Sequence, residues 1–258
     1  MVTMVIYEDF TSFIMTDQHQ HGLLSEGFAR NWNENNFLGF EKKESVLYAI
    51  AQHDRAWIDI DESPIWNDKS GAPYSFHDYP IPIKLQFYRK GIDEIENQNQ
   101  YAALLCSVHY TNFFMGMAED HRIRRYLEDE KKRQTKLFDI LNIKQTDMEL
   151  DFHYQLLKFC DNLSLFVCMQ EAGALDSGVH EWFKNGIKQP FEQFPEKNFQ
   201  VEWSSCHEII IYPFPFNDDF EISVPIRNVP KNLISKYGIE DAYHKTPIHF
   251  RTVKIKEN

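Results

Sequence analysis

The 258-residue sequence predicts a mainly α-helical protein that carries a small antiparallel β-sheet. Between about residues 17 and 190, apolar residues recur every three or four positions, which is the period of an amphipathic helix. From about residue 199 onward, β-branched and aromatic residues alternate with polar ones between Asn, Asp and Pro breaks, which is typical of strands. We therefore expect a single domain, residues 1–258, with a helical core at about 17–190 and a β appendage at about 199–258 plus 2–15.

Helical periodicity marks six segments of the core. In the first of them Leu24, Phe28 and Trp32 recur at steps of four, and His21 extends the same apolar stripe. The expected helices cover residues 17–34, 44–57, 83–97, 101–117, 118–141 and 146–172. Between the second and third helices, residues 61–82 hold four prolines and a Ser-Gly pair, which predicts a long irregular loop of the kind that often walls a binding site.

The strand pattern occurs at both ends of the chain. The expected strands cover residues 2–6, 10–15, 199–203, 208–212, 220–224 and 248–256. An isolated two-stranded hairpin is only marginally stable in water, because it has no sheet or helix to bury its apolar face. We therefore expect the N-terminal hairpin to pair with, or pack beside, the C-terminal strands.

Composition and charge exclude several classes of protein. The chain carries 27 Lys and Arg against 39 Asp and Glu, a formal net charge of −12, and it has no basic stripe that would neutralise nucleic-acid phosphates. Its longest apolar runs fall far short of the ~20 residues that cross a bilayer, and its N-terminus lacks the pattern of a secretion signal. We expect a cytoplasmic protein with reduced cysteines that binds a small molecule rather than nucleic acid or a membrane. The sequence leaves its oligomeric state open.

Histidines and aspartates fall on inward-facing positions of the expected helices. In chain order they are His21, the adjacent pair His53 and Asp54, His109, and Asp161. Asp161 lies within an apolar run, LLKFCDNLSLFVC, where a carboxylate needs a hydrogen-bonded partner or a countercharge. Neighbouring helices can each deliver an imidazole or carboxylate to a divalent cation. The pattern predicts either a site for one or two ions of Fe, Mn, Zn or Mg, or a set of hydrogen-bonded core residues.

The contexts of these residues resemble two known families. The segments QHGLLSEGFARNW, AIAQHDRAW, SVHYTNFF and HYQLLKFCDNLSL are similar to those of an uncharacterised bacterial family of unknown function. The order of a histidine, a His-Asp pair and a distant aspartate also resembles the HD-type metal-dependent phosphohydrolases, whose fold is all-helical. This second resemblance implies an HD-like helical core in which His21, His53, Asp54 and Asp161 bind a metal. It further implies that His109 is an additional ligand, and that Asp54 and His109 act in catalysis.

Four further residues lie close in sequence to the proposed ligands. His153 precedes Asp161 by eight residues, which places the two about 80° apart around a helix, so we expect His153 to orient a substrate phosphate rather than to share an ion. Trp57 is expected to wall the pocket, although aromatic residues more often belong to the core. Arg55 and Lys158 are positioned to neutralise an anionic substrate, with a solvated surface role as the alternative.

These observations predict a metal-dependent phosphohydrolase that acts on a small phosphate ester. The metal would activate a water molecule, which Asp54 would orient. Two alternatives remain open from the sequence: a di-iron oxygenase related to the HD fold, and a non-catalytic helical ligand-binding or sensor module. The sequence contains no phosphate-binding glycine loop, no nucleophile elbow and no H-E-x-x-H motif, so the chemistries that those motifs carry are not expected.

Overall fold

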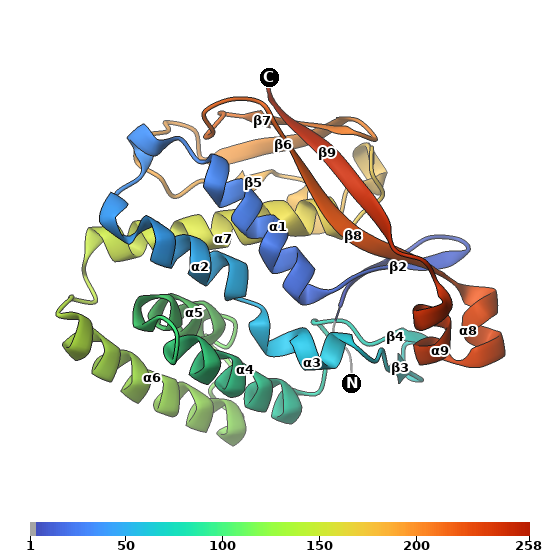
Figure 1. Cartoon of the computed structure of the whole chain (residues 1–258), viewed down its shortest axis with the longest axis horizontal. Helices are drawn as coiled ribbons and strands as arrows, with labels where there is room; N and C mark the ends of the chain where they lie inside the picture. The colour runs from blue at the N-terminus through green and yellow to red at the C-terminus, as the bar shows by residue number, and fades with distance from the viewer. Residues whose placement is uncertain (1–3) are drawn as a thin grey trace.

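The computed structural model describes residues 4–258, and about half of this chain is helical. Figure 1 shows the long helices gathered beside a long, curled sheet. The long helices are α1 (Gln18–Asn31), α2 (Lys43–Gln52), α4 (Ile81–Glu96), α5 (Gln100–Asn112), α6 (His121–Leu141) and α7 (Met148–Cys168). Each of them matches a helix that the periodicity predicts, and most ends agree to within two residues, whereas the others differ by three to five. Shorter helices are α3 (Ile58–Asp61), α8 (Lys231–Tyr237) and α9 (Ile239–Lys245).

Capping residues explain where several of the helices begin and end. The side chain of Asn99 accepts the Ala102 amide at the start of α5, and Asp120 does the same for Arg122 at the start of α6. The Asp147 carboxylate accepts two backbone amides of the first turn of α7. Because each cap satisfies amides that have no partner within the helix, α6 and α7 begin later than the periodicity alone predicts.

The expected fold class, a mainly α HD-like protein with a small antiparallel sheet, is wrong. Within residues 4–258 the main sheet has seven strands in the order β1-β2-β8-β9-β7-β6-β5 and curls into a half-barrel. Its strands are β1 (Val5–Glu8), β2 (Ser12–Thr16), β5 (Ile187–Lys188), β6 (Asn198–Ser205), β7 (Glu208–Tyr212), β8 (Phe220–Pro230) and β9 (His249–Glu257). A separate two-stranded sheet joins β3 (Trp66–Asn67) to β4 (Ala72–Pro73) within the long loop. The protein is therefore a mixed α and β structure.

Strand β8 accounts for much of this difference, because it continues well beyond the expected end at residue 224. Pro225 was the reason to expect a break, since proline removes a ladder hydrogen bond. Strand β2 pairs only with residues 227–230 of β8, so Pro225 faces β9 on one side and no strand on the other. The sheet is also not wholly antiparallel, because α8 and α9 return the chain so that β9 runs parallel to β7.

The N-terminal hairpin joins this sheet, as the sequence analysis predicts. Strand β2 pairs with β1 on one side and with β8 on the other. The predicted first strand begins at Val2, which lies outside the described residues. The long sheet therefore contains strands from both ends of the chain, and the hairpin is not isolated.

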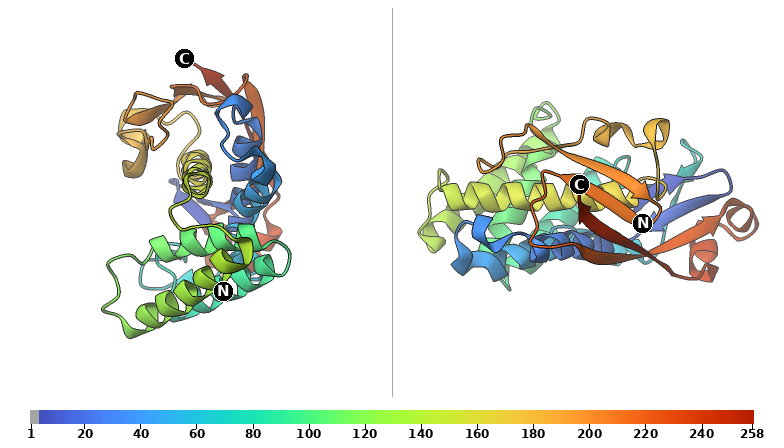
Figure 2. Two further views of the ribbon diagram at one scale, coloured as in Figure 1. Left: turned by 90° about the vertical axis from the view of Figure 1, so that its left-hand side faces the viewer. Right: turned by 90° about the horizontal axis from the view of Figure 1, so that it is seen from above.

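The helices form layers on one side of the sheet. Helix α1 packs against β8, α2 and α7, and α5 packs against α2, α4, α6 and α7. Figure 2 shows α7 between the sheet and the group formed by α4, α5 and α6. The helices α1, α2, α5 and α7 therefore meet in the interior of the protein, and these are the elements from which the histidines and aspartates project.

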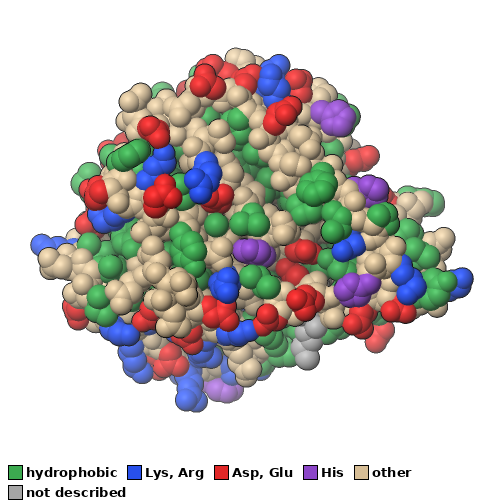
Figure 3. Space-filling model, in the orientation of Figure 1, with side chains coloured by type: hydrophobic (Ala, Val, Ile, Leu, Met, Phe, Trp, Pro, Cys, Tyr) green, Lys and Arg blue, Asp and Glu red, His purple; other side chains and the backbone are tan. Residues whose placement is uncertain are grey.

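One helix carries a strongly charged face on the surface of the protein. In Figure 3 the Lys and Arg side chains gather at the lower edge of the molecule, over α6, and are interleaved with acidic ones. Arg133 of α6 forms ion pairs with Asp93, Glu96 and Glu130, so part of this charge is already neutralised. No helix within residues 4–258 is long and apolar enough to cross a membrane.

Candidate metal centre

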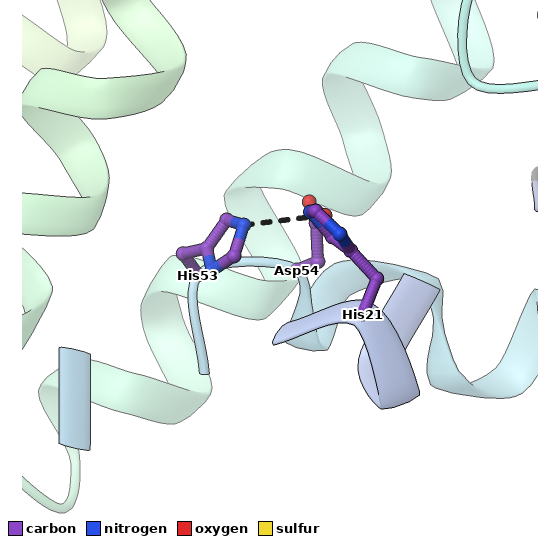
Figure 4. Close-up of side chains that lie close together, drawn as sticks. All are labelled: His21, His53 and Asp54. Atoms are coloured by element: carbon purple, nitrogen blue, oxygen red, sulfur yellow. Dashed lines mark ion pairs between the residues drawn. The ribbon is translucent and has the colours of Figure 1, made fainter. Parts of the chain in front are cut away.

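Five side chains from separate segments converge at one buried point. His21 projects from α1, His53 and Asp54 directly follow α2, His109 projects from α5, and Asp161 projects from α7. None of the five residues is more than 8% exposed. Figure 4 shows His21, His53 and Asp54 pointing toward one another. The structure thus brings together all of the residues that the sequence analysis selected as metal ligands.

All three histidines direct their Nε2 atoms to the two carboxylates. Asp161 Oδ1 lies 2.9 Å from Nε2 of His21 and 3.5 Å from Nε2 of His53, while Asp161 Oδ2 lies 3.6 Å from Nε2 of His109. Asp54 Oδ2 lies 3.7 Å from Nε2 of His21 and 3.4 Å from Nε2 of His53. Ligand atoms in the groups His21-His53-Asp54 and His53-His109-Asp161 lie within 4.8 Å of one another. The two groups share His53, so one compact centre is formed.

Hydrogen bonds on the far side of two rings fix which nitrogen faces the centre. His53 donates its Nδ1 hydrogen to the Ile50 carbonyl at 2.7 Å. His21 Nδ1 lies 2.6 Å from the Ser164 hydroxyl, which itself donates to the Asp161 carbonyl at 2.9 Å and so accepts from the imidazole. When these rings are neutral, their Nε2 atoms are thereby left with lone pairs toward the carboxylates. Metal-binding histidines are commonly oriented in this way.

This arrangement fits a cation between the side chains. Among residues 4–258, the buried Nε2 of His53 has no hydrogen-bond partner, although two carboxylates face it. Lone pairs on Nε2 of His21 and on Asp161 Oδ1, 2.9 Å apart, repel each other unless a proton or a cation lies between them. A set of imidazole nitrogens and carboxylate oxygens suits Zn, Fe or Mn, whereas Mg prefers oxygen ligands alone. The residues present therefore fit a transition-metal ion.

Burial and charge shift the pKa values of the cluster in opposite directions. Burial acts to lower the pKa of His53, but the Asp54 and Asp161 carboxylates outweigh it and raise the pKa to about 9. Burial would raise the pKa of Asp161, but the neighbouring His21, His53 and His109 imidazoles hold it well below its usual range. Burial raises the pKa of Asp54 and lowers that of His109 to about 3. Positive charge on imidazole thus compensates the carboxylates, a role that a bound dication would take over.

Two close contacts place α1 at the right distance from the other segments. A Cβ atom on Gly22 would lie 2.9 Å from the Ala51 carbonyl oxygen, so only glycine lets α1 approach α2 this closely. The Asp61 carboxylate accepts the Gln18 amide at 2.6 Å, and so caps α1 from the neighbouring α3. These contacts set the position of His21 relative to His53.

A cavity of about 540 Å³ opens onto the centre. It is bordered by His21, Asp54, His109 and Asp161, and the rest of its wall is largely aromatic or apolar. The long loop contributes Phe76 and His77, as its expected role as a wall requires, and further lining residues include Gln18, Trp57, Lys84, Tyr88, Asn112, Phe113, Phe114, Met117, Tyr154, Lys158, Asn162, Leu165 and Trp182. The cavity lies within the usual size range of small-molecule sites.

Of the four flanking residues that the sequence analysis selected, the structure brings two to the cavity. Trp57 donates its indole hydrogen to the Asp54 carboxylate, and Lys158 borders the cavity from α7. Arg55 instead pairs with Glu94 of α4 at 2.7 Å and does not line the cavity.

His153 also lies away from the centre. Its Nε2 hydrogen is donated to the Leu38 carbonyl at 2.7 Å, and its Nδ1 accepts the Tyr101 hydroxyl at 2.6 Å. Both ring nitrogens are therefore used in the core, where they join α5 and α7 to the segment after α1. The structure does not bring His153 to the position that its expected contact with a phosphate requires.

Sequence reasoning missed three residues that shape the site. Gln18 lies one turn before His21 on α1, so its helical spacing from His21 could have identified it. Its Oε1 is buried without a hydrogen-bond partner that the structure describes. Burial lowers the pKa of Lys84 to about 8, and its ammonium donates to the Phe76 carbonyl at 2.6 Å. Trp182 lies in the short 3-10 helix Glu181–Phe183, far in sequence from the proposed ligands, and no local sequence pattern indicates that it reaches the cavity.

The fold and the cluster define a protein of mixed α and β structure with a buried centre of three histidines and two aspartates. The chain belongs to the family described as "Protein of unknown function (DUF3891)", whose sequence model matches residues 4–231. The expected resemblance to an uncharacterised family is therefore confirmed, whereas no comparison links the chain to the HD-type superfamily. Searches of curated proteins and of solved structures give no match.

Proposed function

We propose that this protein is a metal-dependent phosphohydrolase that acts on a small phosphate ester. The observation that most supports the proposal is the convergence of three imidazole Nε2 atoms and two carboxylates at one buried point that borders a cavity. His21, His53, Asp54 and Asp161 would hold a first ion. His109, which faces the other oxygen of Asp161, would help to hold a second.

The cation and the protein would contribute different parts of the chemistry. When bound, a divalent cation would lower the pKa of a coordinated water and neutralise phosphoryl oxygens. Asp54 borders the cavity, and the Trp57 indole hydrogen bond holds its carboxylate in place, so it can orient the attacking water and accept its proton. The water oxygen would bond to phosphorus as the bond to the ester oxygen breaks. His109 also borders the cavity, and in a centre that holds a single ion its uncoordinated imidazole would be the second group placed to exchange a proton with the departing alcohol.

The position of Lys158 favours an anionic substrate. It lies three residues before Asp161, on the same face of α7, and it borders the cavity. Its ammonium lies 5.4 Å from the centre of the Tyr154 ring, and it forms no ion pair with any carboxylate whose position the structure describes. An unpaired ammonium beside the centre would attract a phosphate.

We extend the proposal to a cytoplasmic location, since none of the four cysteines is paired.

The proposal is tested by reconstituting the purified protein with Mn, Fe, Zn or Mg and following release of inorganic phosphate from phosphate monoesters. We expect turnover with at least one metal and a loss of at least about 100-fold in Asp54→Asn, which keeps the side-chain shape but removes the base. Asp59→Asn is the matched control, because Asp59 is exposed and pairs with Lys90 outside the cavity. Protein that binds metal but hydrolyses no monoester with any of these ions would contradict the proposal.

One observation also favours a di-iron oxygenase as a second candidate. Asp161 presents one carboxylate oxygen to His21 and His53 and the other to His109, an arrangement suited to bridging two ions. Two bound irons together with oxygen consumption, and no phosphate release, would select this function. Metal binding with neither activity would select a non-catalytic binding module.

A further inference from the structure

We propose that the cavity selects phosphate esters whose alcohol is apolar, such as a single ring or a short alkyl chain. The part of this inference that concerns hydrolysis rests on the proposed function. The preference in binding follows from the cavity itself and can be measured without turnover.

Apolar and aromatic side chains line the cavity from its interior to its mouth. Trp57, Tyr88 and Phe114 are at most 4% exposed and form the buried part of the wall. Phe113 and Trp182 also line the cavity, but they are 50% and 46% exposed, which places them at its mouth. A ligand that enters would pass from half-exposed to buried apolar side chains. Burial of an apolar group against both sets is favourable, because each set loses contact with water.

Two segments that are distant in sequence meet at this mouth. The Trp182 ring lies 4.7 Å from the His77 ring and 6.4 Å from the Phe76 ring, measured between centroids, in edge-to-face contact. A third segment, which follows α5, contributes Met117. This side chain also lines the cavity and is 47% exposed. Large apolar side chains held half-exposed around a cavity are a common sign of a ligand that covers them.

The polar groups of the cavity suit an anion better than a hydroxyl-rich alcohol. Asn112 and Asn162 each donate one amide hydrogen to a carbonyl within their own helix, at 2.7 Å. The Lys84 ammonium donates to the Phe76 and His77 carbonyls of the loop. Lys158 is the cation in the wall that has no such partner among residues 4–258. Apart from Lys158, and from Gln18, whose Oε1 is buried without a described partner, these side chains already bond the protein, so few polar groups of the wall are left for sugar hydroxyls.

The size of the cavity limits the ligand to a small molecule. A volume of about 540 Å³ accommodates a phosphate with one ring or a short chain, within the range of sites for drug-sized ligands. A two-chain lipid would extend far beyond it. The structure thus combines an anion-binding end at Lys158 and the metal centre with an apolar remainder.

The test uses phosphonates, which carry the same head group but cannot be hydrolysed at a P–O–C bond. We would measure the Kd of methyl-, butyl-, hexyl- and phenylphosphonate by calorimetry, with the full-length protein both loaded with Zn and treated with chelator. Each added methylene should tighten binding about threefold to fourfold until the cavity is filled, in both preparations.

Two mouth variants and one distant control make the test specific. Trp182→Ala and Met117→Ala should each weaken hexylphosphonate binding about tenfold and leave methylphosphonate binding unchanged. Both residues are about half-exposed, so neither variant should unfold the protein. Phe10→Ala is the control, because Phe10 is 97% exposed on the N-terminal hairpin and should not affect either ligand.

The outcomes separate this inference from the proposed function. Phosphonates that bind with an affinity independent of chain length, or that do not bind at all, would overturn the inference. Chain-dependent binding without any ester hydrolysis would support it while contradicting the phosphohydrolase proposal. Hydrolysis that favours glycerol phosphate over hexyl phosphate would support the phosphohydrolase proposal and overturn the preference for an apolar alcohol.

Discussion

At the scale of single residues, the orientation of the imidazoles depends on groups that do not themselves face the centre. The Ser164 hydroxyl accepts from His21 Nδ1, donates to the Asp161 carbonyl and lies 2.7 Å from the Ser25 hydroxyl. It therefore connects α1 to α7 directly behind two proposed ligands. Such supporting hydrogen bonds fix the ring orientation and tautomer of a ligand histidine.

Replacing Ser164 should therefore weaken metal binding more than it weakens the fold. In Ser164→Ala we expect zinc affinity, measured by competition with a chromophoric chelator, to fall by about 10- to 100-fold. The free energy of unfolding should fall by about 1–2 kcal/mol, because the hydroxyl bonds both His21 and the Asp161 carbonyl. Ser223→Ala is the control, because Ser223 bonds Thr252 across exposed strands far from the centre. Equal zinc affinity in both variants and the wild type would contradict the role of Ser164.

Lys84 predicts a specific dependence of stability on pH. Burial lowers its pKa from the ordinary 10.5 to about 8, against a smaller opposing effect of Asp78. Between these values the unfolded chain binds a proton that the folded protein does not, so stability rises with pH in that interval. Below pH 8 both states are protonated, and the folded state bears the full cost of burying the charge.

The measurement is the difference in unfolding free energy between the wild type and Lys84→Met, from urea titrations at pH 7.5 to 10.5. Taking this difference cancels the titration of all other groups. Across this pH interval, the unfolding free energy of the wild type should rise relative to that of the variant by at most about 3 kcal/mol. A constant difference would show that Lys84 titrates at its ordinary pKa, and a difference that falls as the pH rises would show a raised pKa; either result would contradict the lowered pKa.

At the scale of elements, the approach of α1 to α2 positions His21. Gly22→Ala would place a methyl group 2.9 Å from the Ala51 carbonyl and 3.7 Å from His53 Nδ1, so the two helices must separate. We expect a loss of about 1–3 kcal/mol in unfolding free energy, with a loss of zinc affinity as the ligands move apart.

Gly27→Ala on the same helix is the matched control. A Cβ atom there would meet only the Ile222 side chain, at an ordinary distance of 3.7 Å. Because alanine is the better helix former, this variant should be neutral or more stable by up to about 1 kcal/mol, with unchanged zinc affinity. If both variants behaved alike, the close approach at Gly22 would not be the cause.

The helices, the strands and the proposed ligands could be predicted from the sequence to different degrees. Helical stripes and buried polar residues are local signals, so the long helices and the set from His21 to Asp161 could be predicted. The path of β8 through Pro225 could not, because whether a proline is tolerated depends on which neighbour pairs beside it. The places of His153 and Arg55 were also unpredictable, because their partners Leu38 and Glu94 come from other segments.

At the scale of the whole molecule, the sheet is attached to the helical layers by Arg251 of β9. Its guanidinium donates to the carbonyls of Val167 and Gln170 at the end of α7, and to the Tyr7 hydroxyl of β1 at 2.8 Å. One side chain of β9 thus satisfies acceptors on a helix end and on one other strand. The helix concerned is the one that carries Asp161, so the sheet helps to hold the centre.

Removing this guanidinium should destabilise the protein as a unit. In Arg251→Met we expect a loss of about 2–4 kcal/mol in unfolding free energy, because several partly buried acceptors lose a charged donor. Lys254→Met on the same strand is the control, since it removes only a half-exposed ion pair with Asp219 and should cost less than about 1 kcal/mol. Equal stabilities of the two variants, measured by urea unfolding, would show that Arg251 does not couple the sheet to α7.

Anomalous diffraction from a zinc-soaked crystal would test the proposed metal centre most directly. We predict a peak at the zinc edge at about 2.0–2.2 Å from Nε2 of His53 and from a carboxylate oxygen of Asp161, and its loss in crystals of His53→Ala. A map without this peak, in which His53 and Asp161 bond only to each other and to protein, would contradict the metal centre and the function proposed from it.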